Sequence, residues 1–333
     1  MVTTLASVFC LLAVVRALDG VHFFGAVAER IVELLRTRRS LVLGLVLLTL
    51  LASMLITNDM ALLTLLPLTA VTLRATGNDD LLAYVFVLEA VAANLGGMIT
   101  PFGSPQNLYL YQHYALGIGD FLRIMALPFA ASVVLIVLAC LPIRRTPHEP
   151  VAFPHRTAVG RSLLYLALFA VTVAIVLRVL PWWAGLGVVA VLLVADRSAL
   201  LKVDYLLIGV LALFFMVAEA LARVPSIAAA LGDLLAHDPL LVSALASQVL
   251  SNVPTAVLAA PFTAEHAQLL VGVNVGGVGT VVASLASLIA LRHYAALRPG
   301  GTGAFLRVFT LVNVVFLVAL LVTTRGAVAA GWL

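Results

Sequence analysis

Two short polar sequences interrupt long apolar runs and carry side chains suited to binding an ion. They are Thr57-Asn58-Asp59 and Ser251-Asn252-Val253-Pro254-Thr255. Hydroxyl and amide oxygens suit a sodium ion, and the unpaired N–H groups of a helix N-terminus attract an anion. The sequence therefore predicts ion binding at Thr57, Asn58, Asp59, Ser251, Asn252 and Thr255.

A second pair of polar sequences follows downstream and combines glycines with amides and hydroxyls. ANLGGMITPFGSPQNL (93–108) and GVNVGGVGTVVASLASLIAL (272–291) align without a gap over Asn, Gly, Gly, Thr and Ser. The further candidates are Asn94, Gly96, Gly97, Thr100, Ser104 and Asn107, with Asn274, Gly276, Gly277, Thr280, Ser284 and Ser287. The predicted sodium ligands are Asn58, Asn94, Asn252 and Asn274. For a single serine or threonine, a hydrogen bond between helices is the alternative.

Three carboxyl groups lie within apolar runs, where an ionised side chain is expensive unless it is paired or functional. Asp59 fits a cation or proton site, and it fits equally well as the N-cap of the following helix. Glu89 and Glu219 fit either proton carriers or carboxyls bonded to a neighbouring helix. The usual catalytic motifs are absent from the sequence. We predict a protein that is not an enzyme and has no cofactor, with sodium or a proton as coupling ion.

The elements that hold these residues are apolar helices. The 333 residues are 63% hydrophobic and 10% charged, with a mean hydropathy of +1.17. Soluble domains carry about 25% charged residues, so the composition excludes a water-soluble protein. The net charge of +4 fits basic loops rather than binding to nucleic acid. We predict an all-α polytopic protein of the lipid bilayer with about eight full spans.

The polar sequences predict breaks in these helices. Runs 40–74 and 239–268 each have a polar centre, and backbone groups freed in lipid must be satisfied by protein or a water-filled cavity. We therefore predict re-entrant hairpins with Asn58 and Asn252 at their tips. Runs 82–115 and 267–291 are predicted to be helices broken at their glycines, and segment 21–39 a helix lying flat at the interface.

The order of these features predicts two inverted repeats. Residues 1–142 form the first, 143–160 a polar linker, and 161–333 the second. Spans 161–181 and 182–195 have no counterpart at the start of the first repeat, so it is expected to lack its leading spans. Fourteen basic residues fall on the predicted cytoplasmic side, against Arg123, Arg223 and Arg325 outside. This places the linker in the cytoplasm and the protein in the inner membrane.

These motifs resemble those of the ion-transporter superfamily, which includes arsenite permeases, sodium–proton antiporters, citrate-transporter-like permeases and divalent-anion–sodium symporters. The resemblance rests on SMLITNDMALLTLLP (53–67), SQVLSNVPTAVLAAP (247–261) and the two glycine-containing sequences above. It implies an inverted-repeat homodimer in which a small core moves as an elevator against a fixed scaffold. Ligand and coupling ion would meet at the two tips and the two breaks.

The resemblance further implies ion-coupled secondary transport of a small anion or oxyanion such as arsenite, citrate, another dicarboxylate or sulfate. Divalent-anion symporters have a sequence that resembles Ser-Asn-Thr at both tips. The first tip of this chain reads Thr57-Asn58-Asp59 instead, which favours arsenite-permease or antiporter relatives. Two alternatives stay open. One is a sodium–proton antiporter that uses Asp59, and the other is a reduced membrane component that does not transport.

Overall fold

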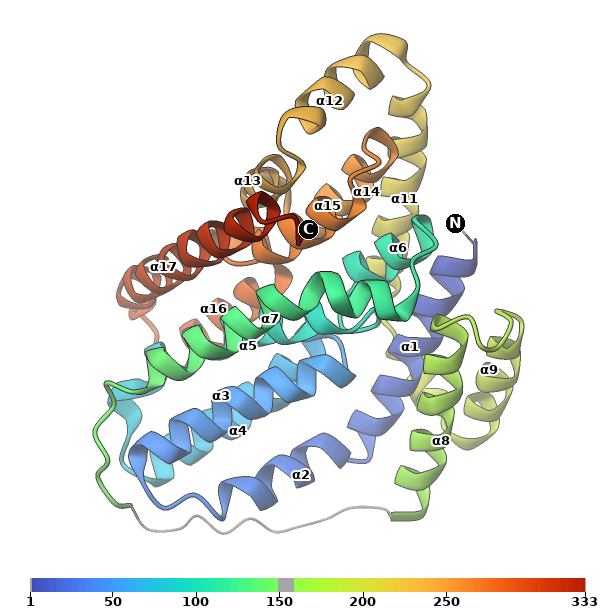
Figure 1. Cartoon of the computed structure of the whole chain (residues 1–333). Helices are drawn as coiled ribbons and strands as arrows, with labels where there is room; N and C mark the ends of the chain where they lie inside the picture. Colours follow the sequence, from blue (N-terminus) through green and yellow to red (C-terminus); the bar gives the residue numbers. More distant parts are fainter. Residues whose placement is uncertain (1, 149–158, 333) are drawn as a thin grey trace.

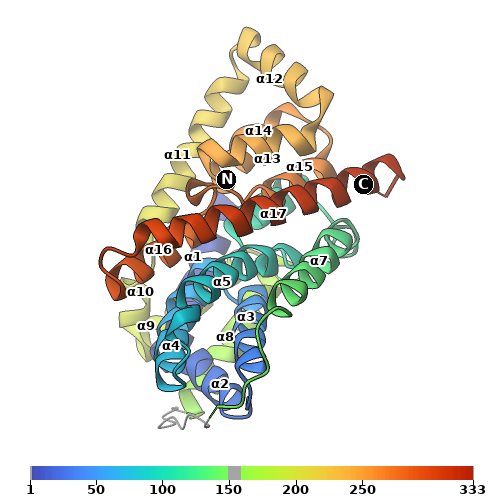
Figure 2. The same cartoon turned by 90° about the vertical axis from the view of Figure 1, so that its left-hand side faces the viewer.

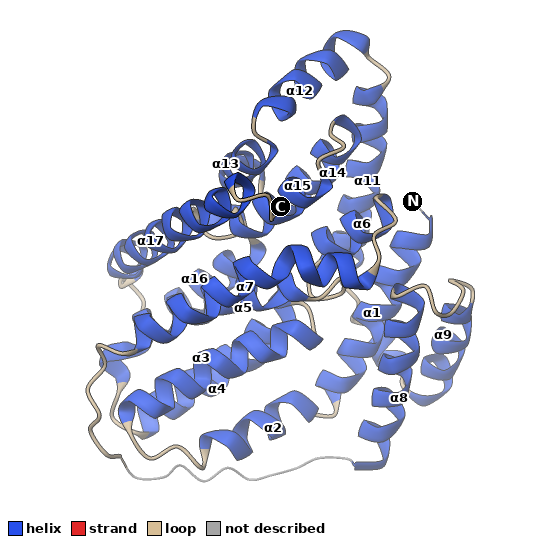
Figure 3. Cartoon of the chain, in the orientation of Figure 1, coloured by secondary structure: helices blue, strands red, loops and turns tan. Residues whose placement is uncertain are grey.

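The computed structural model describes residues 2–148 and 159–332, and every regular element within these ranges is a helix (Figure 3). The predicted all-α class is confirmed. Most of the predicted linker 143–160 lies outside the described residues.

The described helices follow in the order of the two halves (Figure 1). The first half contains α1 (Val2–Gly20), α2 (Phe23–Val32), α3 (Arg38–Leu55), α4 (Asn58–Ala75), η1 (Asp79–Leu81), α5 (Leu82–Gly96), η2 (Gly97–Ile99), α6 (Pro105–His113) and α7 (Ile118–Cys140). The second half contains α8 (Val159–Val176), α9 (Ala184–Ala195), α10 (Arg197–Leu201), α11 (Tyr205–Ala222), α12 (Pro225–His237), α13 (Pro239–Leu250), α14 (Asn252–Ala259), η3 (Ala260–Phe262), α15 (His266–Val275), η4 (Val281–Ala283), α16 (Leu285–Leu297) and α17 (Thr302–Ala329).

Short polar side chains set the starts of several helices. Thr37 and Ser40 form a reciprocal capping box before α3. Asp238 accepts a hydrogen bond from the N–H of Leu241 at 2.9 Å at the start of α13, and Asp204 caps α11 in the same way. Such caps satisfy backbone donors that a helix leaves unpaired.

Within the described residues, six helices are long and apolar enough to cross a membrane, namely α1, α3, α5 extended by its flanking turns, α7, α11 and α17. The bent pair α12–α13 raises the number to seven. This protein is therefore a multi-pass membrane protein. The sequence-based figure of about eight included α8 and α9, whose apolar stretches of 17 and 12 residues fall short of about 20 per crossing.

Both polar tips lie between two packed helices. In hairpin 1 (α3 and α4), extended residues Ile56 and Thr57 separate the arms, and in hairpin 2 (α13 and α14) Ser251 alone does so. The helix pairs α5–α6 and α15–α16 are each broken by a short 3-10 turn and extended residues. Helices thus end and restart where the sequence predicts.

The helices pack in two groups. The scaffold group consists of α1, α8, α9, α10 and α11, and the core group consists of the two hairpins with α5, α6, α7, α15, α16 and α17. Figure 1 shows α3, α5, α7 and α17 running in about the same direction, with α1, α8 and α11 steeply inclined to them on the right. Figure 2 shows α17 above α5 and α7, against which it packs. The groups meet mainly where α11 packs on α14 and α1 packs on α6.

Ion pairs at the two ends of α17 show how the hairpins are oriented. Just before the first residue of α17, Arg298 pairs with Asp79 at 3.1 Å. Asp79 also lies 3.8 Å from Arg74, near the end of α4. Near its other end, Arg325 pairs with Asp238 at 2.8 Å, just before α13. A helix of 28 residues is about 42 Å long. The open ends of hairpins 1 and 2 therefore lie at opposite ends of α17.

Candidate functional site

The two hairpin tips line a single cavity of about 190 Å³. Its lining residues are Asn58 and Asp59 of α4, Pro105 and Gln106 of α6, Leu207, Val210, Leu211 and Phe214 of α11, Ser251, Asn252, Val253 and Pro254 of hairpin 2, and Leu285 of α16. The polar wall comes from the core group, and the apolar wall comes from α11 of the scaffold group. The cavity therefore lies where the two groups meet.

Four helix N-termini reach this cavity. The first residues of α4, α6, α14 and α16 (Asn58, Pro105, Asn252 and Leu285) all line it. The first turn of a helix has unpaired N–H groups and carries about half a positive charge. The residues that precede α4, α6 and α14 make no side-chain cap, which leaves the first-turn N–H groups for a ligand, except at Pro105 and Pro254, which have none. This arrangement suits an anion.

A chain of buried amides connects tip 1 to the second half. Asn58 Nδ2 donates to Asn94 Oδ1 at 3.1 Å, and Asn94 Nδ2 donates to Ser284 Oγ at 2.8 Å. Ser284 in turn caps α16 at the N–H of Ser287, whose hydroxyl lies 3.0 Å from the Ser284 hydroxyl. The structure thus brings together four predicted residues from both halves.

A second chain of amides holds the first break. Asn274 Nδ2 donates to Asn107 Oδ1 at 2.6 Å. Asn107 Nδ2 lies 3.0 to 3.3 Å from the carbonyl oxygens of Gly97, Met98 and Thr100. Carbonyls freed where a helix unwinds need donors inside a membrane, and Asn107 supplies them.

The second break is held by Gln248 of hairpin 2. Gln248 Nε2 donates to the carbonyl oxygens of Gly276 and Val278 at 2.9 and 3.2 Å. Its Oε1 accepts from the N–H of Thr280 at 2.8 Å. One glutamine side chain therefore satisfies three backbone groups of the break.

One contact recurs at equivalent residues of the two halves. Thr100 Oγ1 donates to the carbonyl of Met54 at 2.8 Å, and Thr280 Oγ1 donates to the carbonyl of Gln248 at 2.7 Å. Met54 and Gln248 each precede their tip asparagine by four residues. Equivalent threonines thus tie each break to the first arm of its own hairpin.

The glycines at the breaks permit close packing. A Cβ on Gly96 would collide with Ser53 and with the carbonyl of Leu50 on α3. A Cβ on Gly276 would lie 2.8 Å from the Cα of Ala244 on α13. Each glycine therefore lets the first arm of its hairpin approach the break.

The predicted residues divide into two sets. Asn58, Asp59, Ser251 and Asn252 line the cavity. The others lie outside its wall, namely Thr57, Asn94, Gly96, Gly97, Thr100, Ser104, Asn107, Thr255, Asn274, Gly276, Gly277, Thr280, Ser284 and Ser287. Several of these support the wall through the bonds above, and Thr255 bonds back to the carbonyl of Ser251 at 2.8 Å. Their binding roles stay predictions.

Two glutamines were missing from the sequence-based site. Gln106 lines the cavity, and Gln248 holds the second break. Both are amides within the quoted motifs, Gln106 next to the candidate Asn107 and Gln248 four residues before Asn252, and this was the available signal. Which carbonyl a glutamine meets depends on tertiary packing, so spacing alone did not assign them.

Three cavity residues carry a buried oxygen that has no hydrogen-bond partner. They are Oδ1 of Asn58, Oδ1 of Asp59 and Oε1 of Gln106. Buried polar atoms are normally bonded, so each exception calls for an explanation. A bound cation, a proton or a hydroxyl of a substrate would satisfy these oxygens.

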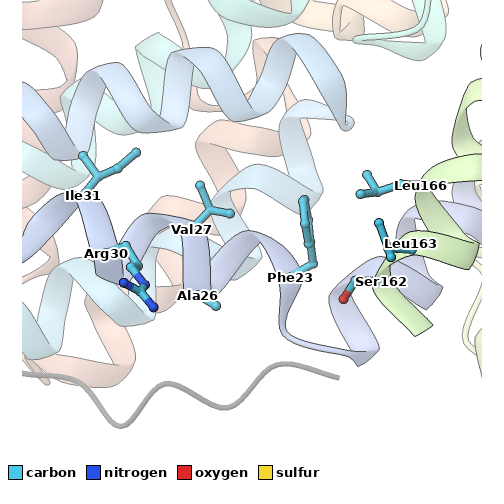
Figure 4. A pocket seen from close by; sticks show the side chains of 8 residues that line it. All are labelled: Phe23, Ala26, Val27, Arg30, Ile31, Ser162, Leu163 and Leu166. Carbon is cyan, nitrogen blue, oxygen red and sulfur yellow. The ribbon is translucent and has the colours of Figure 1, made fainter. Parts of the chain in front are cut away.

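A second hollow, an open groove between α2 and α8, has a different character (Figure 4). Its volume is about 440 Å³, and its lining is apolar apart from Arg30 and Ser162. None of the predicted site residues reaches it. We therefore assign the candidate site to the cavity at the hairpin tips.

The chain with this geometry matches a known family. The family model described as citrate transporter (CitMHS) matches residues 1–291. This chain belongs to the citrate transporter family. The match includes both hairpins and both breaks, so the candidate site lies within the part that defines the family.

Two relatives extend this result. The uncharacterized transporter MJ0456 of Methanocaldococcus jannaschii is 30% identical over 296 residues, which are 87% of this chain and 80% of that protein. The inner membrane protein YbiR of Escherichia coli is 31% identical over 299 residues, covering 87% and 79%. The predicted kinship with the ion-transporter superfamily is confirmed for this member of the citrate transporter family.

Proposed function

We propose that this protein is an ion-coupled secondary transporter that binds a small anion in the cavity between the two hairpin tips. The convergence of four helix N-termini on that cavity carries the proposal. The family description favours citrate or a related carboxylate, and it outweighs the tip sequence, which favours arsenite. Sulfate is the further candidate. An enzymatic role has no support in this site.

Alternating access would follow an elevator movement of the core group against the scaffold group. The apolar wall of the cavity supports this, because Leu207, Leu211 and Phe214 of α11 bind the core without side-chain hydrogen bonds. Such a surface can slide without leaving buried polar groups unpaired. We expect a homodimer in the inner membrane with a cytoplasmic linker, and the name of YbiR supports that location.

Uptake into vesicles tests the proposal. Purified protein in liposomes is given labelled citrate, and unlabelled sulfate and arsenite compete in parallel. We expect Asn58→Ala and Asn252→Ala to abolish uptake and Asn78→Ala to preserve it. Asn78 is the matched control because it is also buried but bonds to Thr76, outside the cavity. Unchanged uptake in both tip variants would overturn the proposed site.

Sodium is the proposed coupling ion at the tips. The predicted ligands Asn58 and Asn274 each have a buried Oδ1 without a partner, which supports cation binding. The Oδ1 of Asn94 already accepts a hydrogen bond from Asn58, so this bond would have to break before Asn94 could bind sodium. Asn252 is the fourth predicted ligand. Replacing sodium with choline in the uptake assay should stop accumulation. Undiminished accumulation in choline would exclude sodium.

A sodium–proton antiporter that uses Asp59 is the second candidate. The supporting observation is that Asp59 lines the cavity and has a buried oxygen without a partner. In vesicles that contain a pH-sensitive dye, sodium addition would then release protons in the wild type but not in Asp59→Asn. A sodium-driven proton flux that survives Asp59→Asn would sink this alternative.

A further inference from the structure

Glu89 is a completely buried carboxyl group away from the cavity. It lies in the middle of α5, its exposed fraction is 0%, and it is absent from the cavity wall. An isolated charge in such surroundings is very costly, so a buried carboxyl must be paired, neutral or both. Nothing in the proposed substrate path uses it.

Both arms of hairpin 1 contact this carboxyl. Thr69 Oγ1 of α4 donates to Glu89 Oε1 at 2.6 Å, and Thr49 Oγ1 of α3 lies 3.2 Å from the same oxygen. The second oxygen, Oε2, is buried and has no partner. The carboxyl thus lies where α3, α4 and α5 meet.

The hydrogens of this cluster are all used when Glu89 carries a proton on Oε1. Thr49 Oγ1 lies 3.0 Å from the carbonyl of Leu45 and can donate its only hydrogen there. Its lone pairs then accept the Glu89 proton, while Thr69 still donates to Oε1. If Glu89 were ionised, its carboxylate would accept hydrogen bonds from at most two hydroxyl groups, those of Thr69 and Thr49. Thr49 would then lose its hydrogen bond to the carbonyl of Leu45.

Charged groups on the surrounding helices lie toward their ends. The ionisable residues on the described helices and turns packed against α5 are Arg38 and Arg39 of α3, Asp59 and Arg74 of α4, Asp79 and Asp80 of η1, Asp120, Arg123 and Cys140 of α7, His266 of α15, Arg292, His293 and Tyr294 of α16, and Arg307 and Arg325 of α17. Tyr294 stacks edge-on with Phe86, its ring centroid 6.4 Å away. Among the described residues, none forms an ion pair with Glu89.

The second half offers a natural comparison. The break alignment places Leu269 opposite Glu89, and the tip alignment places Ser243 opposite Thr49. Leu269 is fully buried in α15, and Ser243 donates to backbone carbonyls of its own helix. The second half packs its hairpin without a carboxyl. Glu89 is therefore not a packing requirement of the fold.

We infer that Glu89 is a proton-binding site that senses the packing of hairpin 1 on α5. The carboxyl is protonated while Thr49 and Thr69 both contact it, and it releases the proton to water when an arm of the hairpin moves away. No covalent bond other than O–H forms or breaks. Hairpin movement and proton movement are then linked, whatever anion the cavity binds.

The first test needs no transport and therefore separates this inference from the proposed function. Infrared spectra of the purified protein near neutral pH are compared for the wild type and Glu89→Gln. We expect the difference spectrum to show the carbonyl stretch of one protonated carboxyl. Glu219→Gln is the matched control, since Glu219 is exposed on α11 and pairs with Arg223 at 2.5 Å. It should leave the carboxyl band unchanged.

Two further measurements complete the test. Thr69→Val keeps the carboxyl and its bond to Thr49 but removes the hydrogen bond that Thr69 donates to Oε1, so the band should remain and shift only slightly. In liposomes, Glu89→Gln should retain exchange of anion for anion but lose accumulation driven by a pH gradient. A difference spectrum with only ionised carboxylate bands would overturn the inference. So would accumulation that remains equally pH-driven in Glu89→Gln.

Discussion

The two hairpins share their framework but not their chemistry. Each has an asparagine at its tip, a threonine that ties the break to its first arm, and glycines that admit that arm. Only hairpin 1 has a carboxyl group next to its tip asparagine and another in the helix behind it, Asp59 and Glu89, where the second half has Val253 and Leu269. The repeated residues thus build the framework around the cavity, and the two carboxyl groups distinguish the first half from the second.

The largest expected effect tests the shared framework. Gly96→Val and Gly276→Val would each push a side chain into the backbone of the adjacent hairpin arm, at a cost of about 3 kcal/mol or more. We expect neither variant to yield folded protein in size-exclusion chromatography. Gly303→Val is the control, because a Cβ there meets nothing within 4 Å. If only one of the two glycines proved sensitive, the halves would not share their packing.

The second prediction concerns the side-chain amides that close the breaks. Asn107→Asp and Gln248→Glu keep the shape but replace an N–H donor with an oxygen facing backbone carbonyls. Each should lower stability by about 2 kcal/mol, because a lost bond leaves buried carbonyls unsatisfied. Thermal unfolding in detergent should show similar falls for both. A fall confined to Asn107→Asp would mean that the second break is held by other contacts.

The third prediction separates the tips. Asp59→Asn removes a carboxyl group, and with it the negative charge of its ionised form, from the cavity wall and should tighten anion binding about tenfold, or about 1.4 kcal/mol. Val253→Asp adds a charge to the opposite tip and should weaken binding by a similar factor. Titration with labelled citrate measures both. Weaker binding in Asp59→Asn would show that this carboxyl holds a cation needed by the anion.

The smallest expected effect lies in the backbone. Ser251 has a φ of 73°, a conformation that side chains rarely adopt, whereas Thr57 at the first tip has a φ of −62°. Ser251→Gly should raise stability by up to about 1 kcal/mol, and Thr57→Gly should lower it by about as much. Unfolding temperatures of the two variants give the comparison. Changes of the same sign in both variants would contradict a strained second tip.

The sequence was sufficient for features that depend on local pattern. Long apolar runs predicted the helices, and polar centres at Asn58 and Asn252 predicted the tips, because an unpaired backbone in lipid leaves few alternatives. The sequence was insufficient for hydrogen bonds whose two residues lie on elements far apart in the chain. The bonds from Asn94 to Ser284 and from Asn274 to Asn107 join the two halves, and no spacing within one half encodes them.

The number of long apolar helices differs from the predicted number of spans for a physical reason of the same kind. The runs corresponding to α8 and α9 are apolar enough to suggest crossings, but helix ends fall where caps and turns place them. Asp196 ends α9 by capping the next short helix through the N–H groups of Ser198 and Ala199. Hydropathy alone does not show this.

The uncharged stretch of α17 indicates how deep the second break lies in the bilayer. Between Arg307 and Arg325 the helix has no charged residue, and these 18 residues of helix rise about 27 Å, close to the roughly 30 Å of the hydrocarbon layer. Asn313 accepts a hydrogen bond from the N–H of Gly279 in the second break at 3.4 Å. It lies three residues, or about 5 Å, from the middle of that stretch. We therefore expect the second break to lie near the centre of the hydrocarbon layer.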